Sequence, residues 1–449
     1  MADTTQASRR SFLGALTAAS YQRISGANDR IGLGFIGYGL IGGRHVEDFK
    51  KEPDADLVAA SDVYQPRLEQ ALAACGPRAK GYHDFRKLLD DKDVHAVVIS
   101  TPDHWHPLQA ILACAAGKDV YVEKPLTVAI AEGRWMTTAA RRFNRVVTCG
   151  TQQRSGRHYA EAIKLIRGGY LGKVHTFRIT SYRNIMPGFG VTPDSAPPAG
   201  LDYDFWLGPA PQRPYSRHRS LYHFRWFWDY SGGQMTNLGT HEIDVVHWAM
   251  EAAGPRAVSS AGGRFALEDD GETPDTQDAI FEYPGFTVEV AIREAAGGRR
   301  PGGQFDIYGT KASMSLSRDG FEVFPEMRIH PENAIPAWST PAGHPGHADV
   351  KPVPWTQPAR GVGSSDEQMR LHVRNFLDCI KSRERPAADI EGGHRVSAAC
   401  HLANLSLRLG RRIRWDPEAE RIIDDAEASA LLVRPYRKPW DDVLRSLNL

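Results

Sequence analysis

The sequence predicts an α/β protein in which an N-terminal doubly wound parallel sheet precedes an α+β domain with an open, mostly antiparallel sheet. Three observations lead to this fold class. An apolar strand at 31–36 runs into a glycine-rich turn. Residues 30–150 alternate between strand and helix patterns, which is typical of a parallel sheet with helices on both faces. Residues 256–324 carry short β-rich runs separated by turn residues, as an antiparallel meander requires.

Length and composition limit the class of protein. The 449 residues suggest two or three domains with well-buried cores. The formal net charge is +1, so no overall field would recruit nucleic acid or an anionic membrane. The five cysteines stand singly, without CxxC pairs or metal-ligand spacing, which argues against a disulfide scaffold and against a zinc site. We therefore expect no metal, and no segment is long and apolar enough to span a bilayer.

The first residues resemble an export signal. Residues 8–13 (SRRSFL) form a twin-arginine pattern, a short apolar stretch follows at 12–19, and 25–27 is a small-x-small cleavage candidate. The alternative is a disordered tail with a chance Arg-Arg pair, because 20–24 is more polar than is usual in such signals. We predict a signal segment at 1–29 and a periplasmic or exported protein, or a cytoplasmic one if the signal is not functional.

The glycine-rich turn at 37–42 (GYGLIG) is a candidate dinucleotide site. Its first glycine permits the turn, the second lets the backbone approach a pyrophosphate, and the third lets helix and strand pack closely. The N-terminus of the following helix offers free N–H groups to phosphates. The alternative is a turn without a ligand. The predicted cofactor contacts here are Gly37, Tyr38, Gly39, Leu40, Ile41 and Gly42.

A second apolar strand at 57–61 ends in Asp62, about 20 residues after the glycine turn. An acid at this place meets the ribose hydroxyls of a dinucleotide and repels the 2′-phosphate of NADP, so NAD is favoured over NADP. The alternative is that Asp62 only caps a turn or helix.

Three further strands of the first domain are expected at 94–101, 119–123 and 145–149, with helices at 106–116 and 128–143. Ligands of doubly wound sheets bind beyond the C-terminal ends of the strands, so side chains there are candidates for cofactor contact. Besides Asp62, these candidates are Thr101, Pro102, His104, His106, Glu123 and Lys124. Helix capping is the alternative for the two histidines.

Lys124 follows an apolar strand and precedes a proline, so its side chain is expected to project into the crevice. Partial desolvation and a nearby positive nicotinamide ring would lower the pKa of Lys124. A lysine of this kind suits proton transfer or stabilisation of an alkoxide. The alternative is a surface lysine paired with Glu123.

Beyond residue 150 the pattern changes. A helix at 157–168 and a strand at 173–183 precede an irregular stretch at 184–222, and the densest aromatic cluster follows at 224–230. Aromatic rings beside Arg and Asp suit a sugar, because C–H faces stack on rings while hydroxyls bond to charged groups. Core packing under a loop is the alternative. The candidate substrate contacts are Arg154, Trp206, Arg225 and Trp228, and Gln153 is a candidate cofactor contact.

A helix following two glycines carries Asn237, His241, Asp244 and His247. His241 lies four residues after Asn237 and three before Asp244, so each pair shares a helix face. His241 is a candidate general base and substrate contact, oriented by Asn237 or Asp244. One alternative is a buried structural histidine. Another is a metal site of His241, Asp244 and His247, for which no fourth ligand is evident.

The last third of the chain is expected to complete the second sheet. The predicted meander strands are 277–283, 286–293, 304–308, 312–317 and 320–324. An excursion with little periodicity follows at 325–365, and helices are predicted at 366–382 and 393–409. An antiparallel sheet can keep one face free of its own helices, so we expect a homo-oligomer formed through this sheet.

Five motifs, GFIGYGLIG, TPDHWH, YVEKPLT, GTQQR and GGQMTNLGTHEID, occur in this order. Together they resemble the Gfo/Idh/MocA oxidoreductases, named for glucose–fructose oxidoreductase and inositol dehydrogenase. The resemblance covers roughly 30–410. It implies an NAD-binding Rossmann domain at 30–150 and a substrate and oligomerisation domain at 151–415, with the nicotinamide between them and a tail at 416–449.

By motif, Lys124 matches the family's catalytic lysine and His241 its catalytic histidine. The position of Asn237 is usually aspartate in the dehydrogenases. An amide can orient a histidine but does not stabilise imidazolium by charge, so either Asp244 assists or His241 has a lower pKa than in those enzymes. The aromatic segment and the PYR-type tail resemble those of exported, carbohydrate-associated members.

The resemblance implies oxidation of a sugar, cyclitol or glycoside hydroxyl by hydride transfer to tightly bound NAD. His241 would take the hydroxyl proton and Lys124 would stabilise the developing alkoxide. Little free NAD is available outside the cytoplasm, so an exported enzyme would regenerate its cofactor within one cycle. Two alternatives stay open: an NAD-dependent glycosidase that works by oxidation, elimination, addition and reduction, and a non-catalytic ligand-binding protein on the same fold. The expected partner is a small-molecule carbohydrate and no nucleic acid.

Overall fold

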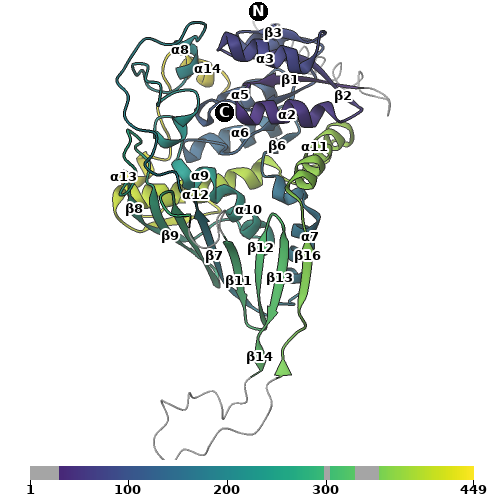
Figure 1. Cartoon of the computed structure of the whole chain (residues 1–449), viewed down its shortest axis with the longest axis vertical. Helices are drawn as coiled ribbons and strands as arrows, with labels where there is room; N and C mark the ends of the chain where they lie inside the picture. Colours follow the sequence, from purple (N-terminus) through teal and green to yellow (C-terminus); the bar gives the residue numbers. More distant parts are fainter. Residues whose placement is uncertain (1–29, 298–303, 329–352, 449) are drawn as a thin grey trace, which may run out of the picture.

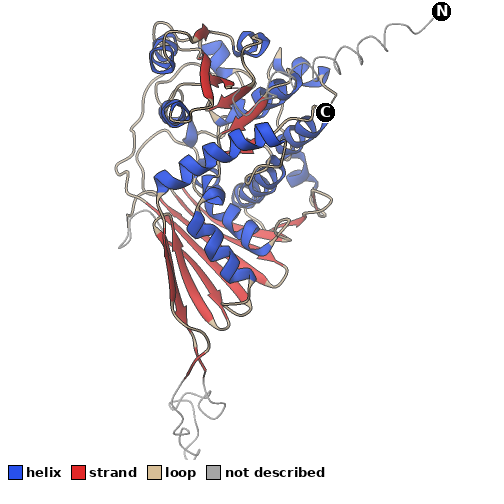
Figure 2. Ribbon diagram, turned by 90° about the vertical axis from the view of Figure 1, so that its right-hand side faces the viewer, coloured by secondary structure: helices blue, strands red, loops and turns tan. Residues whose placement is uncertain are grey.

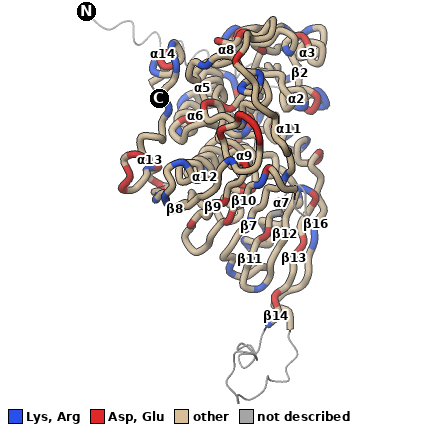
Figure 3. The backbone as a smooth tube through the Cα atoms, turned by 60° about the vertical axis from the view of Figure 1, so that its left-hand side comes forward, with Lys and Arg blue, Asp and Glu red and all other residues tan. Residues whose placement is uncertain are grey.

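The computed structural model describes residues 30–297, 304–328 and 353–448. The predicted signal segment at 1–29 and much of the predicted excursion at 325–365 lie outside these residues. A parallel sheet with its helices forms one end of the molecule, and a larger sheet extends away from it (Figure 1). Basic and acidic residues are interspersed over both parts (Figure 3).

Six parallel strands form the sheet of the first domain, in the order β3-β2-β1-β4-β5-β6. This is the strand order of doubly wound dinucleotide-binding sheets, and it confirms the predicted fold. β3 was not predicted, because it has three residues and is largely exposed. The strands are β1 Ile31–Ile36, β2 Ala55–Ser61, β3 Lys80–Tyr82, β4 Ala96–Ile99, β5 Asp119–Val122 and β6 Val147–Cys149.

Helices cover both faces of this sheet. On one face Phe49 of α2 meets Phe376 of α11, with ring centroids 6.2 Å apart. On the other face Leu108 of α5 and Met136 of α6 are buried in a separate apolar cluster. Because α11 comes from the second half of the chain, both halves share the core of the first domain. The helices are α2 Leu40–Lys50, α3 Gln65–Cys75, α4 Phe85–Asp90, α5 His106–Ala115, α6 Ile130–Arg142 and α11 Ser365–Ser382.

The second sheet has ten strands in the order β16-β13-β12-β11-β7-β10-β9-β8-β17-β18. Only β7 and β10 pair in parallel, so the predicted mostly antiparallel sheet is confirmed. The strands are β7 Val174–Tyr182, β8 Ala257–Gly263, β9 Thr276–Tyr283, β10 Phe286–Arg293, β11 Gln304–Gly309, β12 Ala312–Ser317, β13 Gly320–Pro325, β16 Ala359–Val362, β17 Ile413–Asp416 and β18 Arg421–Ile422.

Helices cover one face of this second sheet (Figure 2). Side chains alternate along the strands, so that Phe281 of β9 is buried in the core while its neighbour Ile280 is 50% exposed on the far face. The covering helices are α7 Arg157–Arg167, α10 Gly239–Met250 and α12 Ile390–Leu409. A short separate pair, β14 Met327–Arg328 and β15 Val353–Pro354, extends beyond the sheet.

The single helix predicted after residues 232–233 is interrupted. α9 spans Gly233–Asn237 and α10 begins at Gly239, with Leu238 between them. Asn237 therefore ends one helix and His241 lies in the first turn of the next. Their spacing of four residues does not place them on one continuous helix face, a difference that matters for the site.

The remaining elements are short. They are η1 Asp103–Trp105, η2 Gln152–Ser155, α8 Tyr203–Leu207, η3 His223–Trp226, α13 Ala426–Ala430 and α14 Trp440–Ser446. The segment predicted as a tail packs onto the first domain, where Trp440 lies against Trp105 with ring centroids 4.8 Å apart. In the described part of the chain, no helix combines the length and apolar character that a membrane crossing needs.

Candidate active site

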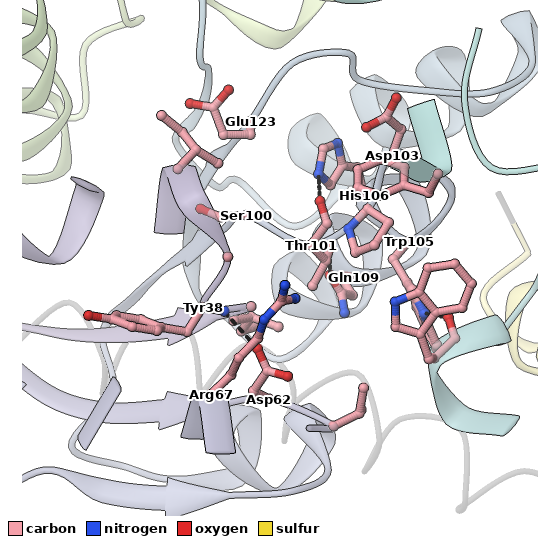
Figure 4. Close-up of a pocket in the computed structure, with 18 of the residues that line it drawn as sticks. Tyr38, Asp62, Arg67, Ser100, Thr101, Asp103, Trp105, His106, Gln109 and Glu123 are labelled. Atoms are coloured by element: carbon pink, nitrogen blue, oxygen red, sulfur yellow. Dashed lines mark hydrogen bonds between the residues drawn. The ribbon is translucent and has the colours of Figure 1, made fainter. Parts of the chain in front are cut away.

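A pocket opens at the C-terminal ends of β1, β2, β4 and β5, where the sequence placed the dinucleotide (Figure 4). The first domain lines it with the glycine turn, Asp62, Thr101, Pro102, His106, Glu123 and Lys124. The second domain closes it with Phe205, Trp206 and Tyr222 of the irregular stretch and with Phe224 and Arg225 of the aromatic cluster. Both domains therefore contribute to one cavity beside the glycine turn.

The three glycines of the turn differ in what surrounds them. Gly37 has a φ of +89°, and a Cβ there would lie 2.9 Å from the backbone N of Thr101. A Cβ on Gly42 would lie 2.3 Å from the carbonyl O of Gly37. A Cβ on Gly39 would meet nothing within 4 Å, although Gly39 lines the pocket and precedes α2 without a side-chain cap. The turn thus leaves open backbone at a helix N-terminus, which fits a pyrophosphate.

Asp62 is fixed at the end of β2. Its carboxylate accepts hydrogen bonds from the backbone N of Tyr38 at 2.8 Å and of Tyr64 at 2.9 Å. Burial raises the pKa of Asp62, and these hydrogen bonds oppose that effect. Arg67 of α3 lies beside Asp62 in the pocket, a residue that the sequence did not single out (Figure 4). The oriented carboxylate suits ribose hydroxyls, so the pocket fits the adenosine end of NAD.

Lys124 joins the two domains at the other end of the pocket. Its Nζ donates to the carbonyl O of Asn237 at 3.0 Å and to its Oδ1 at 2.9 Å. Burial lowers the pKa of Lys124, the negative charge of Glu123 opposes this, and the charge of Arg225 adds to the lowering. A lysine with a lowered pKa, held by an uncharged amide, keeps a proton available for a ligand oxygen.

Glu123 is buried behind Lys124. Its Oε1 lies 2.7 Å from Nε2 of His45, and its Oε2 accepts from the backbone N of Lys124 at 3.0 Å. Burial alone would raise the pKa of Glu123, but the hydrogen bond and charge of His45 lower it on balance. The carboxylate therefore supplies a fixed negative charge next to the lysine.

His241 is 5% exposed, and its Nδ1 has no hydrogen-bond partner among the described residues. Burial holds the pKa of His241 well below its usual value, and the charges of Lys124 and Arg318 add to that lowering. His241 does not line the pocket itself. A neutral imidazole close to Lys124 can accept a proton, as a general base must.

The two residues expected to orient His241 have other partners. Oδ1 of Asn237 accepts from Lys124, and its Nδ2 donates to Gln234 at 2.9 Å. Both carboxylate oxygens of Asp244 accept from Nε of Arg154, at 2.9 and 2.8 Å. That expectation is wrong: the break at Leu238 separates Asn237 from the helix of His241, and Asp244, although on the same helix as His241, is held by Arg154. Asn237 instead positions Lys124.

Several predicted contacts lie outside the pocket. His104 is buried, with Nε2 3.0 Å from the carbonyl O of Trp206, and burial lowers its pKa to about 3. Gln153 donates to the Tyr159 hydroxyl at 3.1 Å. Trp228 lies under Arg408, whose guanidinium carbon is 5.2 Å from the ring centroid. These side chains, and Arg154 with them, pack around the site without facing the cavity that Lys124 lines.

His106, Trp206 and Arg225 do line the pocket. Both ring nitrogens of His106 lie 2.7 Å from carbonyl oxygens, those of Pro125 and Thr101, so this side chain fixes the strand ends. The guanidinium of Arg225 lies over the Phe224 ring at 4.8 Å from its centroid. Other rings of the aromatic segment, such as Tyr230, are buried core residues, as the alternative interpretation held.

Glu242 is a further group that the sequence did not single out. Its Oε1 lies 3.4 Å from Nε2 of Gln153. Burial raises the pKa of Glu242 to about 7, and the charge of Arg318 opposes this. No local pattern marks Glu242, because its burial depends on η2 and on the β12–β13 turn, both distant in sequence.

A stability measurement tests this placement of Glu242. The folded-state pKa is above the unfolded value of 4.5, so the stabilising effect of the protonated form is present below pH 4.5 and is lost as pH rises through 7. We expect Glu242→Gln to raise the free energy of unfolding at pH 8 by about 3 kcal/mol and to leave it unchanged at pH 4. Denaturant titrations at both pH values measure this. Glu251→Gln is the control, because Glu251 is exposed and lies just beyond the C-terminal end of the same helix; an equal effect of the two substitutions at pH 8 contradicts the placement.

Two family models match the chain. The model of the Gfo/Idh/MocA oxidoreductase family with its NAD-binding Rossmann fold matches residues 31–151. The model of the C-terminal α/β domain of this oxidoreductase family matches residues 161–260 and 364–442.

The chain is also similar to individual proteins, at moderate sequence identity. Myo-inositol 2-dehydrogenase of Thermotoga maritima is 34% identical over 172 residues, which are 38% of this chain and 47% of that protein. Levoglucosan dehydrogenase of Pseudarthrobacter phenanthrenivorans is 26% identical over 398 residues, 82% of this chain and 93% of that protein. The chain thus spans about half the length of the inositol dehydrogenase. Among solved structures, levoglucosan dehydrogenase in complex with NADH and levoglucosan gives a TM-score of 0.64 at 21% identity, over 86% of this chain and 99% of that chain.

Proposed function

Because the chain belongs to the Gfo/Idh/MocA family of NAD-binding oxidoreductases, we propose that it oxidises a hydroxyl group of a sugar or cyclitol. The observation that carries this proposal is the junction at Lys124. Its ammonium group lines the dinucleotide pocket of the first domain and is held by Asn237 of the second domain. The similarity to an inositol dehydrogenase and a levoglucosan dehydrogenase supports a polyhydroxylated ring as the substrate.

The residues of the first domain would hold NAD. The open backbone at Gly39 and the N-terminus of α2 suit the pyrophosphate, and Asp62 suits the adenosine ribose. When bound, NAD supplies a nicotinamide ring that accepts a hydride from a carbon atom. Tight binding of NAD, as an exported enzyme requires, is part of the proposal.

The residues at the junction of the two domains, around Lys124, would carry out the proton transfer. Lys124 donates a hydrogen bond to the substrate oxygen and stabilises the alkoxide that develops as the O–H proton is removed, before the C–H hydride leaves and the carbonyl forms. His241 is neutral because of its burial; it lies outside the pocket lining, so it would take the hydroxyl proton from a substrate that extends past Lys124 towards it. Asn237 keeps the lysine in place without a countercharge that would reduce its effect on the alkoxide. Trp206 and Arg225 offer an apolar face and a charged donor to the sugar.

A screen of sugars, cyclitols and aryl glycosides with the protein loaded with NAD tests the function. We expect nicotinamide reduction, seen as new absorbance near the NADH band, with at least one polyhydroxylated ring. Release of an aglycone without net reduction would indicate the glycosidase reaction instead. Protein that binds NAD yet reacts with no compound would indicate a ligand-binding protein and contradict the proposal.

The role proposed for Asp62 predicts how its substitution changes the affinities for NAD and NADP. We expect Asp62→Ser to weaken NAD binding by about 10- to 100-fold, because a charged hydrogen-bond partner of the ribose is lost. The same change should improve NADP binding, because the repelling charge is removed while Arg67 remains beside the site. Calorimetric titration of both cofactors measures this. Asp56→Ser on the same strand is the control, and unchanged affinities for Asp62→Ser contradict the role.

Two expectations from the sequence also stay as proposals. Export through the twin-arginine pattern at 8–13 is tested by fractionating cells that express the chain and its Arg9→Lys/Arg10→Lys variant.

Self-association through the second sheet is supported by the exposed Ile280 and Phe324 on its uncovered face. Light scattering of the Ile280→Asp variant tests this, because the charge should weaken the oligomer. If the variant self-associates as strongly as the wild type, the interface does not lie on this face.

A further inference from the structure

The segment 434–440 (RPYRKPW), here called the C-terminal strap, crosses the first domain between α13 and α14 (Figure 1). It was predicted as part of a tail. None of its residues lines the pocket. Each of its large side chains is nevertheless anchored to a part of the chain that either lines the pocket or directly supports the lining.

Arg434 and Tyr436 form the first anchor, on a buried carboxylate. Nε of Arg434 donates to Oε1 of Glu132 at 2.6 Å, and the Tyr436 hydroxyl donates to the same oxygen at 2.9 Å. Glu132 is 0% exposed, so this pair replaces the water that a buried carboxylate would otherwise need. Arg434 also donates to the carbonyl O of His104 at 2.8 Å. The anchor therefore ties the start of α6 to the η1 turn.

Trp440 forms the second anchor, on two aromatic side chains that line the pocket. Its ring lies edge-on to Trp105, at 4.8 Å between centroids, and stacked on Phe205 at 5.5 Å. Nε1 of Trp105 donates to the carbonyl O of Trp206 at 2.9 Å. Trp105 also packs so closely on Gly208 that a Cβ there would lie 2.0 Å from the indole ring. Trp440 thus backs the contact between the η1 turn and α8.

Arg437 forms the third anchor, on backbone carbonyls around α8. Its guanidinium donates to the carbonyl O of Asp204 at 2.8 Å and of Gly208 at 3.1 Å. Its own backbone N donates to the carbonyl O of Pro209 at 3.1 Å. These bonds satisfy the C-terminal end of a five-residue helix that could not hold its shape alone.

We propose that the C-terminal strap is a positioning element of the cofactor pocket. It holds the η1 turn of the first domain against α8 of the second domain, so that Trp105, Phe205 and Trp206 stay closed over the bound dinucleotide. The inference rests on the proposed identity of this pocket as the NAD site. It adds that retention of the cofactor depends on residues that never touch it.

The rate of cofactor release tests the strap. NADH is loaded, chased with excess NAD, and followed by its fluorescence in the wild type, Trp440→Ala and Arg437→Ala. Because the pocket wall loses its backing, we expect cofactor release to be about tenfold faster in both variants and close to the wild-type rate in Trp440→Phe. Arg445→Ala is the control, since Arg445 bonds only to Asp441 and Asp442 of its own helix.

The outcomes separate the two proposals. If the wild type holds no NADH, the assignment of the pocket fails. If the wild type holds NADH and both variants release it at the wild-type rate, the strap serves stability alone and the inference is overturned, whatever the melting temperatures. Should Trp440→Ala not fold, Arg437→Ala decides, because Arg437 lies at the surface edge of the strap with 19% of its side chain exposed.

Discussion

Replacing Lys124 with methionine is expected to lower kcat by about 10²- to 10⁴-fold, while NAD still binds. Methionine keeps the length of the side chain but removes the ammonium that would stabilise the alkoxide. The hydrogen bonds to Asn237 are lost as well. Because the glycine turn and Asp62 are not altered, the affinity for NAD should stay near that of the wild type.

Steady-state kinetics together with a cofactor titration measure this effect. Lys51→Met is the matched control, because Lys51 is 64% exposed and forms its ion pair with Asp48, away from the pocket. Asn237→Ala should show a smaller loss, since the lysine then keeps its charge but not its position. A Lys124→Met enzyme with wild-type kcat would remove Lys124 from the chemistry.

Valine in place of Gly39 is expected to abolish NAD binding without lowering the melting temperature. The φ of Gly39 is −90°, which any residue adopts, and a Cβ there meets no protein atom within 4 Å. The added side chain fills space that the protein itself leaves open, at the place where the backbone must approach a pyrophosphate. The loss is therefore one of binding and not of folding.

Gly42→Ala provides the matched contrast. Its Cβ would lie 2.3 Å from the carbonyl O of Gly37, so the helix must shift away from the turn and the melting temperature should fall. Thermal unfolding and NAD titration of both variants separate the two effects. NAD binding to Gly39→Val at wild-type strength would show that the dinucleotide does not cross the turn at this glycine.

The features read correctly from the sequence are those encoded by neighbouring residues. The glycine turn, Asp62 at the end of β2 and Lys124 at the end of β5 each follow from a short apolar strand and the residues after it. The second sheet was also recognisable, because its hairpins alternate buried and exposed side chains. β3 was missed because a strand of three residues, two of them exposed, leaves no periodic signal.

The misreadings concern relations between distant or interrupted segments. The orienting role of Asn237 assumed one continuous helix, and the break at Leu238 removes that premise. Asp244 shares a helix with His241, but its carboxylate is taken up by Arg154, which is 90 residues away in sequence. His104 follows a strand end like its neighbours, yet it turns into the core under Trp206. The direction in which such a side chain points depends on packing between segments about a hundred residues apart. The spacing of neighbouring residues in the sequence carries no information about it.

Contacts across the fold explain what was overlooked. Arg434 reaches Glu132 over more than 300 positions, and the dense Arg, Tyr and Trp content of the strap was the one available hint of its anchoring. Glu242 owes its raised pKa to burial by elements distant in sequence. The roles of such residues can be identified only from the folded structure, in which segments distant in sequence contact one another.

The most direct test of the central claim follows one deuterium atom. A sugar that reacts in the screen is prepared with deuterium on the carbinol carbon and mixed with protein carrying one equivalent of NAD, and the nicotinamide is analysed after a single turnover. Transfer of the deuterium to the nicotinamide ring, slowed by about 10²- to 10⁴-fold in Lys124→Met, is the predicted result. Deuterium found in the water or left on an unreacted sugar would contradict oxidation of a carbohydrate hydroxyl at this site.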